Sequence, residues 1–137
     1  MENSGFKKIT ESEKRLYGKY GLLVSGFSKN EQDALIAIVE KFNSLKVIFV
    51  QDEHMDTLLK DMFDKDDRCG YGNDSSLKRV IIFSGFKEKD LVNFMERVKA
   101  LSLRKNLWAA LTPISEKWTI RRLIKELELE DKEMPKK

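Results

Sequence analysis

The chain has 137 residues, of which 41% are hydrophobic and 36% charged. This apolar content is enough to fill the core of one domain, and it excludes an intrinsically disordered protein. The 26 basic and 23 acidic residues leave a net charge of +3 and are interspersed along the chain, whereas dedicated nucleic-acid-binding proteins usually carry a clustered basic face.

The sequence contains neither the hydrophobic segment of a signal peptide nor an apolar run long enough to span a bilayer. Its one cysteine, Cys69, cannot form an internal disulfide, which is typical of proteins in a reducing compartment. We therefore expect a soluble, cytoplasmic protein that does not associate with membranes.

Residues 1–20 are largely polar, and we expect them to form a leader with at most one short helix. Thr10 followed by Glu13 is a capping-box pattern, which marks the start of that helix. Residues 22–24 predict the first strand, and Gly26 allows the backbone to turn sharply out of it.

The segment after this turn predicts a helix packed on a sheet. Ser28 and Glu31 form a second capping box, and apolar residues then recur at helical spacing over residues 34–42. Residues 47–50 read Val-Ile-Phe-Val, a continuous apolar run typical of a strand that is buried on both faces. A shorter apolar stripe over residues 55–62 predicts another helix.

Residues 64–78 are rich in Asp, Gly, Asn and Ser, which predicts a polar loop between two halves of the chain. The second half then repeats the pattern of the first. The elements expected after the loop are, in chain order, a strand at residues 79–83, a helix at 91–101, a strand at 107–111, a helix at 118–127 and a charged tail at 131–137.

This order predicts an internal repeat, β-α-β-α twice, in which residues 21–63 correspond to residues 79–128. The motif Ser-Gly-Phe follows the first strand of each half, at residues 25–27 and 84–86. We therefore expect a single α/β domain over residues 21–130 that consists of two half-repeats.

Two arrangements of the half-repeats fit these elements. If their two-fold axis runs along the strands, the sheet is mainly parallel with strand order 2-1-3-4, the two long helices lie on opposite faces, and both Ser-Gly-Phe turns meet at the carboxyl edge. If the axis is perpendicular to the sheet, the central strands are antiparallel and both long helices lie on one face. The apolar strands favour burial on both faces, and on that ground we predict the first arrangement, with helices on both faces of the sheet.

In the mainly parallel arrangement, the helices after the two turns direct their N-terminal amide groups into one crevice, which suits a small phosphate or carboxylate ligand. The alternative is that glycine and serine serve only to leave a strand and cap a turn. Trp118 is expected to lie in the core, or to mark a binding surface if it is exposed. The candidate residues for a ligand or partner site are Ser25, Gly26, Phe27, Ser28, Ser84, Gly85, Phe86, Thr112 and Trp118.

The sequence offers no recognisable catalytic set. His54 is the only histidine and has no serine, cysteine or histidine partner at the spacing of a triad or a metal site. The segment 64–75 lacks the ligands of a calcium loop, and residues 70–73 lack the lysine ending of a phosphate loop. We therefore predict no catalytic residue, no metal and no cofactor, and we do not favour an enzyme.

The second half resembles a known family. Residues 81–86, 109–113, Trp118 and the helix at 123–127 are similar to the prokaryotic family called domain of unknown function 3783, and the repeated first half extends the resemblance over most of residues 20–130. The resemblance implies an α/β fold and a soluble prokaryotic protein. It supplies no function and no site residues.

Three functions remain open. We favour a non-enzymatic module that binds a protein partner or a second copy of itself, because the chain fuses two half-domains without a catalytic set. The second is a sensor or binder of a small anionic ligand, or a minor enzyme acting on one, at the paired Ser-Gly-Phe turns. The third is a weak contact with nucleic acid, which the dispersed charge disfavours. The basic residues that would make this contact are Arg104, Lys105, Arg121, Arg122 and Lys125.

Overall fold

Four strands form one sheet in the order β2-β1-β3-β4. We describe residues 14–133 of a computed structural model, and the capping box expected at residues 10–13 lies outside this range. The strands are β1 (Gly21–Ser25), β2 (Val47–Val50), β3 (Val80–Ser84) and β4 (Leu107–Ala110).

The sheet is mixed. β1 and β2 are parallel, as are β3 and β4, but the central strands β1 and β3 are antiparallel, with Leu23 opposite Ile82. The predicted strand order 2-1-3-4 is therefore confirmed, whereas the prediction of a mainly parallel sheet is wrong.

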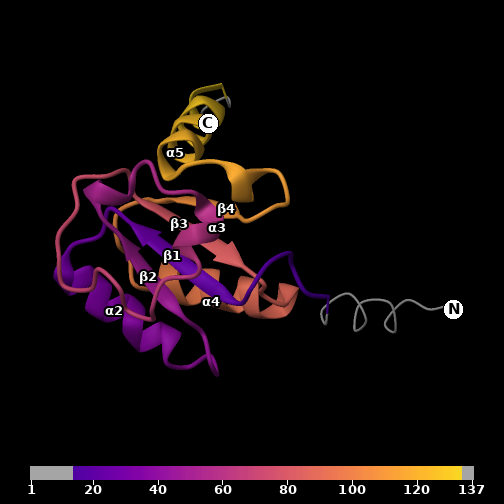
Figure 1. Ribbon diagram of the computed structural model, residues 1–137. Coiled ribbons are helices and arrows are strands. Elements are labelled where there is room, and N and C mark those ends of the chain that lie inside the picture. Colours follow the sequence, from indigo (N-terminus) through magenta and orange to yellow (C-terminus); the bar gives the residue numbers. More distant parts are fainter. Residues whose placement is uncertain (1–13, 134–137) are drawn as a thin grey trace, which may run out of the picture.

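The helices cover both faces of this sheet. The first helix of each half, α2 (Lys29–Val39) or α4 (Glu88–Ala100), lies on the same face, and α3 (Leu59–Met62) and α5 (Ile120–Glu133) cover the other (Figure 1). The prediction that the two long helices lie on opposite faces is wrong, and the arrangement with the two-fold perpendicular to the sheet matches the structure. None of the helices within residues 14–133 is long and apolar enough to cross a bilayer.

The burial of the strands on both faces does not distinguish a parallel from an antiparallel central pair of strands. Leu22 and Val24 face the core under α2 and α4, whereas Leu23 between them faces the core under α3 and α5. The second core exists because the segments after β2 and β4 fold back over the sheet. An apolar strand is thus covered on both sides without any parallel central pair.

Both halves contain the same order of elements. Each has a strand, a long helix, a strand, a 3₁₀ helix and a further helix, the 3₁₀ helices being η1 (Asp52–His54) and η2 (Ser115–Lys117). An isolated bridge pairs Leu58 with Thr119, immediately before α3 and α5. That this symmetry reflects a repeat in the sequence stays a prediction.

The predicted start of α2 is confirmed. Ser28 is its N-cap and accepts a hydrogen bond from the Glu31 amide, while a Glu31 carboxylate oxygen accepts one from the Ser28 amide at 2.9 Å. This reciprocal pair satisfies two backbone donors at the helix end, as the capping box requires.

The outer edge of β2 is closed by the chain itself. The Arg68 amide donates to the Val47 carbonyl at 2.7 Å, and the Phe49 amide donates to the Cys69 carbonyl at 2.8 Å. The following Gly70 has φ +81° and lies so close to the Phe49 carbonyl oxygen that a side chain would collide with it. Only glycine permits this approach without strain.

Candidate functional site

The two Ser-Gly-Phe turns lie at opposite edges of the sheet. Because β1 and β3 are antiparallel, Ser25 at the end of β1 faces Val80 at the start of β3, and Ser84 at the end of β3 faces Gly21. The expectation that the two turns meet in one crevice is therefore wrong. A ligand bound at one turn cannot reach the other.

Each turn is packed against the chain. Gly26 has φ +80°, and a side chain there would collide with the backbone carbonyl of Leu77. The Ser25 hydroxyl donates to the Lys78 carbonyl at 2.8 Å. Gly85, at φ +68°, lies equally close to the carbonyl of Gly18. The glycines thus allow close backbone packing, which is the structural alternative to an anion site.

The aromatic residues of the two turns belong to the core. Phe27 and Phe86 are both buried in the cluster under α2 and α4, and the Phe86 ring meets Phe83 edge-on with the centroids 4.9 Å apart. Ser84 is fully buried, and its hydroxyl has no hydrogen-bond partner among the described residues. Neither Phe27 nor Phe86 is placed to contact a ligand.

Thr112 and Trp118 lie beyond the carboxyl end of β4. Thr112 is bonded to the first residue of η2: its hydroxyl accepts from the Ser115 amide at 3.0 Å, and its own amide donates to the Ser115 hydroxyl at 3.1 Å. Trp118 is half-buried against the core under α5, and the Arg122 guanidinium lies over its ring, 4.4 Å from the centroid. Of the predicted site residues, these two and Ser84, Gly85 and Phe86 lie at or beyond the carboxyl ends of the parallel pair β3–β4.

A cavity of about 520 Å³ opens beside the first turn. It lies between Gly26, the segment that leads into β3 and the segment that leads into β4. Its lining is basic. The residues that line it are Gly26, Ser75, Ser76, Leu77, Lys78, Arg79, Arg104, Lys105, Asn106, Leu107 and Asp131.

Arg79 forms the rigid wall of this cavity. Its Nη1 donates to Glu31 at 2.8 Å and to the Gly26 carbonyl at 3.3 Å, and its Nη2 donates to the Arg104 carbonyl at 3.2 Å. The guanidinium also lies over the Phe27 ring, 4.1 Å from the centroid. Arg79 therefore joins the first turn, the start of α2 and the loop before β4.

The Glu31 carboxylate is held in its ionised form. Burial alone raises its pKa, but hydrogen bonds from Arg79 and Ser28 outweigh this effect, so the pKa lies below the ordinary value for glutamate. Within the described residues, Glu31 pairs with Arg79, and Asp131 also lies in the lining of the cavity. Four cations against Glu31 and Asp131 leave the described part of the cavity with a net positive charge.

Sequence reasoning grouped Arg104 and Lys105 with basic residues of the last helix, and it missed Lys78 and Arg79 as site residues. The structure brings Arg104 and Lys105 beside Lys78 and Arg79, while Arg121, Arg122 and Lys125 of α5 do not line the cavity. Lys78 and Arg79 directly precede β3, and only the position of β3 beside β4 could have shown that they meet the segment before β4.

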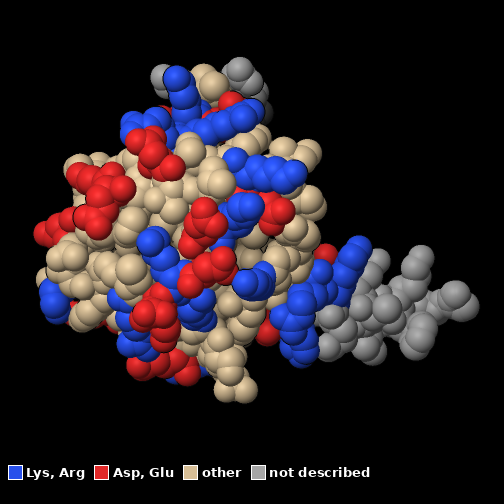
Figure 2. Space-filling view, in the orientation of Figure 1, with Lys and Arg blue, Asp and Glu red and all other residues tan. Residues whose placement is uncertain are grey.

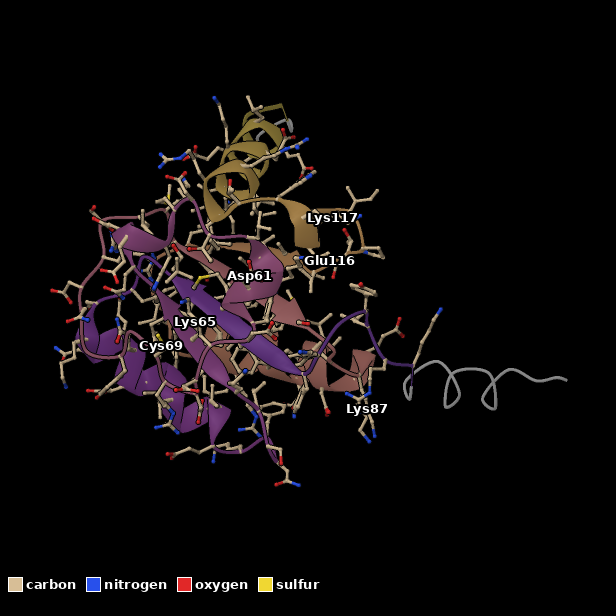
Figure 3. The ribbon with its side chains drawn as sticks, viewed as in Figure 1. Asp61, Lys65, Cys69, Lys87, Glu116 and Lys117 are labelled. Atoms are coloured by element: carbon tan, nitrogen blue, oxygen red, sulfur yellow. The ribbon has the colours of Figure 1, made fainter. Side chains whose placement is uncertain are left out.

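The remaining reactive groups have structural roles. His54 is buried, and its Nδ1 accepts a hydrogen bond from the Gln51 amide at 2.9 Å. Cys69 lies on the loop that closes β2, well separated from Glu116 and Lys117 on η2 (Figure 3). Within residues 14–133, no group of three or more His, Cys, Asp or Glu side chains could hold a metal ion.

Another cavity, of about 430 Å³, is lined by charges of both signs, several of which are already paired. Lys19 and Asp64 form an ion pair at 2.8 Å, and the Tyr17 hydroxyl donates to Glu116 at 2.9 Å. This hydrogen bond and burial raise the pKa of Tyr17. The cavity therefore presents a weaker field to a charged ligand than the basic cavity beside Gly26.

The face that carries α3 shows both signs of charge interspersed, without a broad basic area (Figure 2). Extended nucleic acid requires a continuous positive track along the surface. This face therefore does not resemble a nucleic-acid interface.

Residues 79–134 match the model of a family described as Domain of unknown function (DUF3783). The match covers β3, α4, β4 and α5 and confirms the resemblance for this half of the chain. No curated protein and no solved structure matches the chain. The family description assigns no activity.

Proposed function

We propose that the protein is a self-association module, and not an enzyme, which pairs with a second copy of itself through β4. The observation that carries this proposal is the difference between the two edges of the sheet. The outer edge of β2 is closed by residues 67–70, whereas no described segment pairs with the outer edge of β4.

The backbone of β4 offers free hydrogen-bonding groups on this edge. The Leu107 and Leu111 amides donate to Arg79 and Phe83 of the inner neighbour at 2.9 and 2.8 Å, so the odd-numbered residues face β3. The amide and carbonyl groups of Trp108 and Ala110 therefore point outward. Ala110 is exposed, and the rest of β4 is half-buried, while the other three strands are completely buried.

Open edge strands pair readily with another strand, and proteins usually protect them with charges, proline or a covering segment. β4 has none of these within the strand itself, since it reads Leu-Trp-Ala-Ala. The preceding segment, in contrast, carries Arg104 and Lys105. If the β4 strands of two copies paired in parallel, these cations would lie side by side. Antiparallel pairing places them at opposite ends of the interface.

Antiparallel pairing of β4 with β4 also satisfies two-fold symmetry, which is the commonest symmetry of protein dimers. It would place the segment after β4 of one copy, with Ile114 at 71% exposure, beside the segment before β4 of the other. The product is a continuous sheet of two copies in which each outer edge is a protected β2.

The test is the mass of the purified chain by sedimentation velocity as a function of concentration. We expect a reversible shift from 16.0 kDa to twice that value. The Ala110→Lys variant adds a charge at the outward edge and should remain monomeric.

The matched control is Val92→Lys, which adds the same charge at a position that is 53% exposed and lies on α4, outside the edge strand. This variant should dimerise as the unmodified chain does. A chain that stays monomeric at about 1 mM, or an Ala110→Lys variant that dimerises equally well, would overturn the proposal.

A further inference from the structure

We infer that the basic cavity beside Gly26 binds a small molecule through its phosphate groups. This inference concerns side chains before β3 and β4 and does not depend on dimerisation. The cavity is defined by its 520 Å³ volume and by four cations, Lys78, Arg79, Arg104 and Lys105. Sites for small ligands commonly have a volume of roughly 300 to 1,000 Å³.

The charge of this cavity requires a polyvalent anion. Glu31 neutralises Arg79 directly, and among the described residues Asp131 is the acidic residue in the lining. An excess of about two positive charges remains, which a single carboxylate does not balance. A phosphate ester or a diphosphate carries about two negative charges or more at pH 7 and several strong acceptor oxygens.

The cavity also supplies neutral donors. Ser75, Ser76 and Asn106 line it, and their hydroxyl and amide groups can bind the remaining phosphate oxygens. The apolar residues Leu77 and Leu107 lie in the same lining and suit the carbon skeleton of an organic phosphate.

Arg79 preorganises the site. Because its guanidinium is fixed by Glu31 and by two backbone carbonyls, the segments before β3 and β4, which carry Lys78 and Lys105, are joined to each other. Preorganised donors bind an anion more strongly, since less conformational freedom is lost on binding. Arg104 and Lys105 are exposed, so their side chains are accessible to a ligand.

The experiment is isothermal titration calorimetry of the full chain with pyrophosphate, and in parallel with adenosine diphosphate, at about 0.15 M salt. We expect saturable binding of both probes with one site per chain. Tighter binding of adenosine diphosphate would assign the site to an organic phosphate, and equal binding would assign it to the phosphate groups alone.

The decisive variant is Arg104→Ala/Lys105→Ala, which should weaken pyrophosphate binding at least about tenfold. Its control, Lys89→Ala/Lys117→Ala, removes the same charge from exposed positions that do not line the cavity, and should bind as the unmodified chain does. Thermal unfolding should show that both variants fold. The Ala110→Lys variant should still bind pyrophosphate. Loss of dimerisation and loss of pyrophosphate binding can therefore be distinguished.

Two outcomes would overturn the inference. One is the absence of binding of either probe to the unmodified chain. The other is an equal loss of binding in both double variants, together with tighter binding of a single-stranded oligonucleotide, because this pattern indicates a dispersed contact with nucleic acid.

Discussion

Arg79 Nη1 and Glu31 Oε1 lie 2.8 Å apart and join the start of β3 to the start of α2 across 48 positions of the chain. The pair is largely buried, with 9% of the Arg79 side chain and 18% of the Glu31 side chain exposed. It connects the two halves of the molecule at the mouth of the basic cavity.

Replacing Arg79 by alanine should lower the free energy of unfolding by roughly 3 kcal/mol, because the buried Glu31 carboxylate then lacks its main partner. Urea denaturation measures this change. The control is Arg121→Ala, which breaks an ion pair with Asp56 whose side chains are 59% and 81% exposed. A similar loss of unfolding free energy in both variants would show that the burial of the Arg79–Glu31 pair does not increase its contribution to stability.

Replacing Gly26 by alanine should destabilise the protein much more than the same change at Gly72. Both glycines have positive φ, +80° and +93°, so both variants carry backbone strain of roughly 1 kcal/mol. Only at Gly26 would the new methyl group meet backbone carbonyls, at Leu77 and Lys78. We expect a further loss of roughly 2 kcal/mol there in chemical denaturation. Equal losses would contradict the packing seen at this turn.

The single histidine should titrate below its ordinary pKa of 6.5. Burial lowers the pKa of His54 and the nearby charge of Lys65 adds to this, while Glu53 opposes it. Since the folded pKa is the lower one, the unfolded chain takes up the proton first. The contribution to stability is therefore complete above pH 6.5 and is lost as the pH falls through the folded pKa.

Proton NMR resolves this titration without assignment, because the chain contains no other histidine. Protonation of Nδ1 also breaks the hydrogen bond from the Gln51 amide, so that amide signal should move with the same midpoint. A midpoint at or above 6.5 would contradict the burial of this side chain.

Gln32 should control the position of the loop that borders the basic cavity. Its side chain is 2% exposed; it donates to the Asn73 carbonyl at 2.9 Å and accepts from the Gly72 amide at 2.8 Å. Gln32→Ala should lower the free energy of unfolding by roughly 2 to 4 kcal/mol, since buried partners lose their bonds. It should also speed hydrogen exchange at Gly72. Asn30→Ala, at an exposed position of the same helix, should do neither.

Local signals in the sequence predicted the elements well. The Ser28–Glu31 capping box lies where its pattern indicates, and the apolar runs at residues 22–24 and 47–50 form neighbouring strands. These features depend on residues close together in the chain, so short-range propensities determine them.

Such short-range signals could not predict whether the central strands β1 and β3 are parallel or antiparallel. Leu23 and Ile82 would be buried in either arrangement, because each lies on a strand with helices on both faces. The choice depends on how the segments after β2 and β4 fold back, and this is a long-range property. The same holds for the basic cavity, since Lys78 and Lys105 meet only through the pairing of β3 with β4.

The closed outer edge of β2 limits the size of any assembly built through this sheet. A strand ladder grows into a fibre only when both of its edges accept another copy. Here the hydrogen bonds from Arg68 and to Cys69 occupy one edge, so growth through β4 stops after a single addition. The loop around Gly70 thus limits assembly to two copies. If this loop were displaced, both edges of the sheet could pair with another copy, and the chain could form an open-ended polymer.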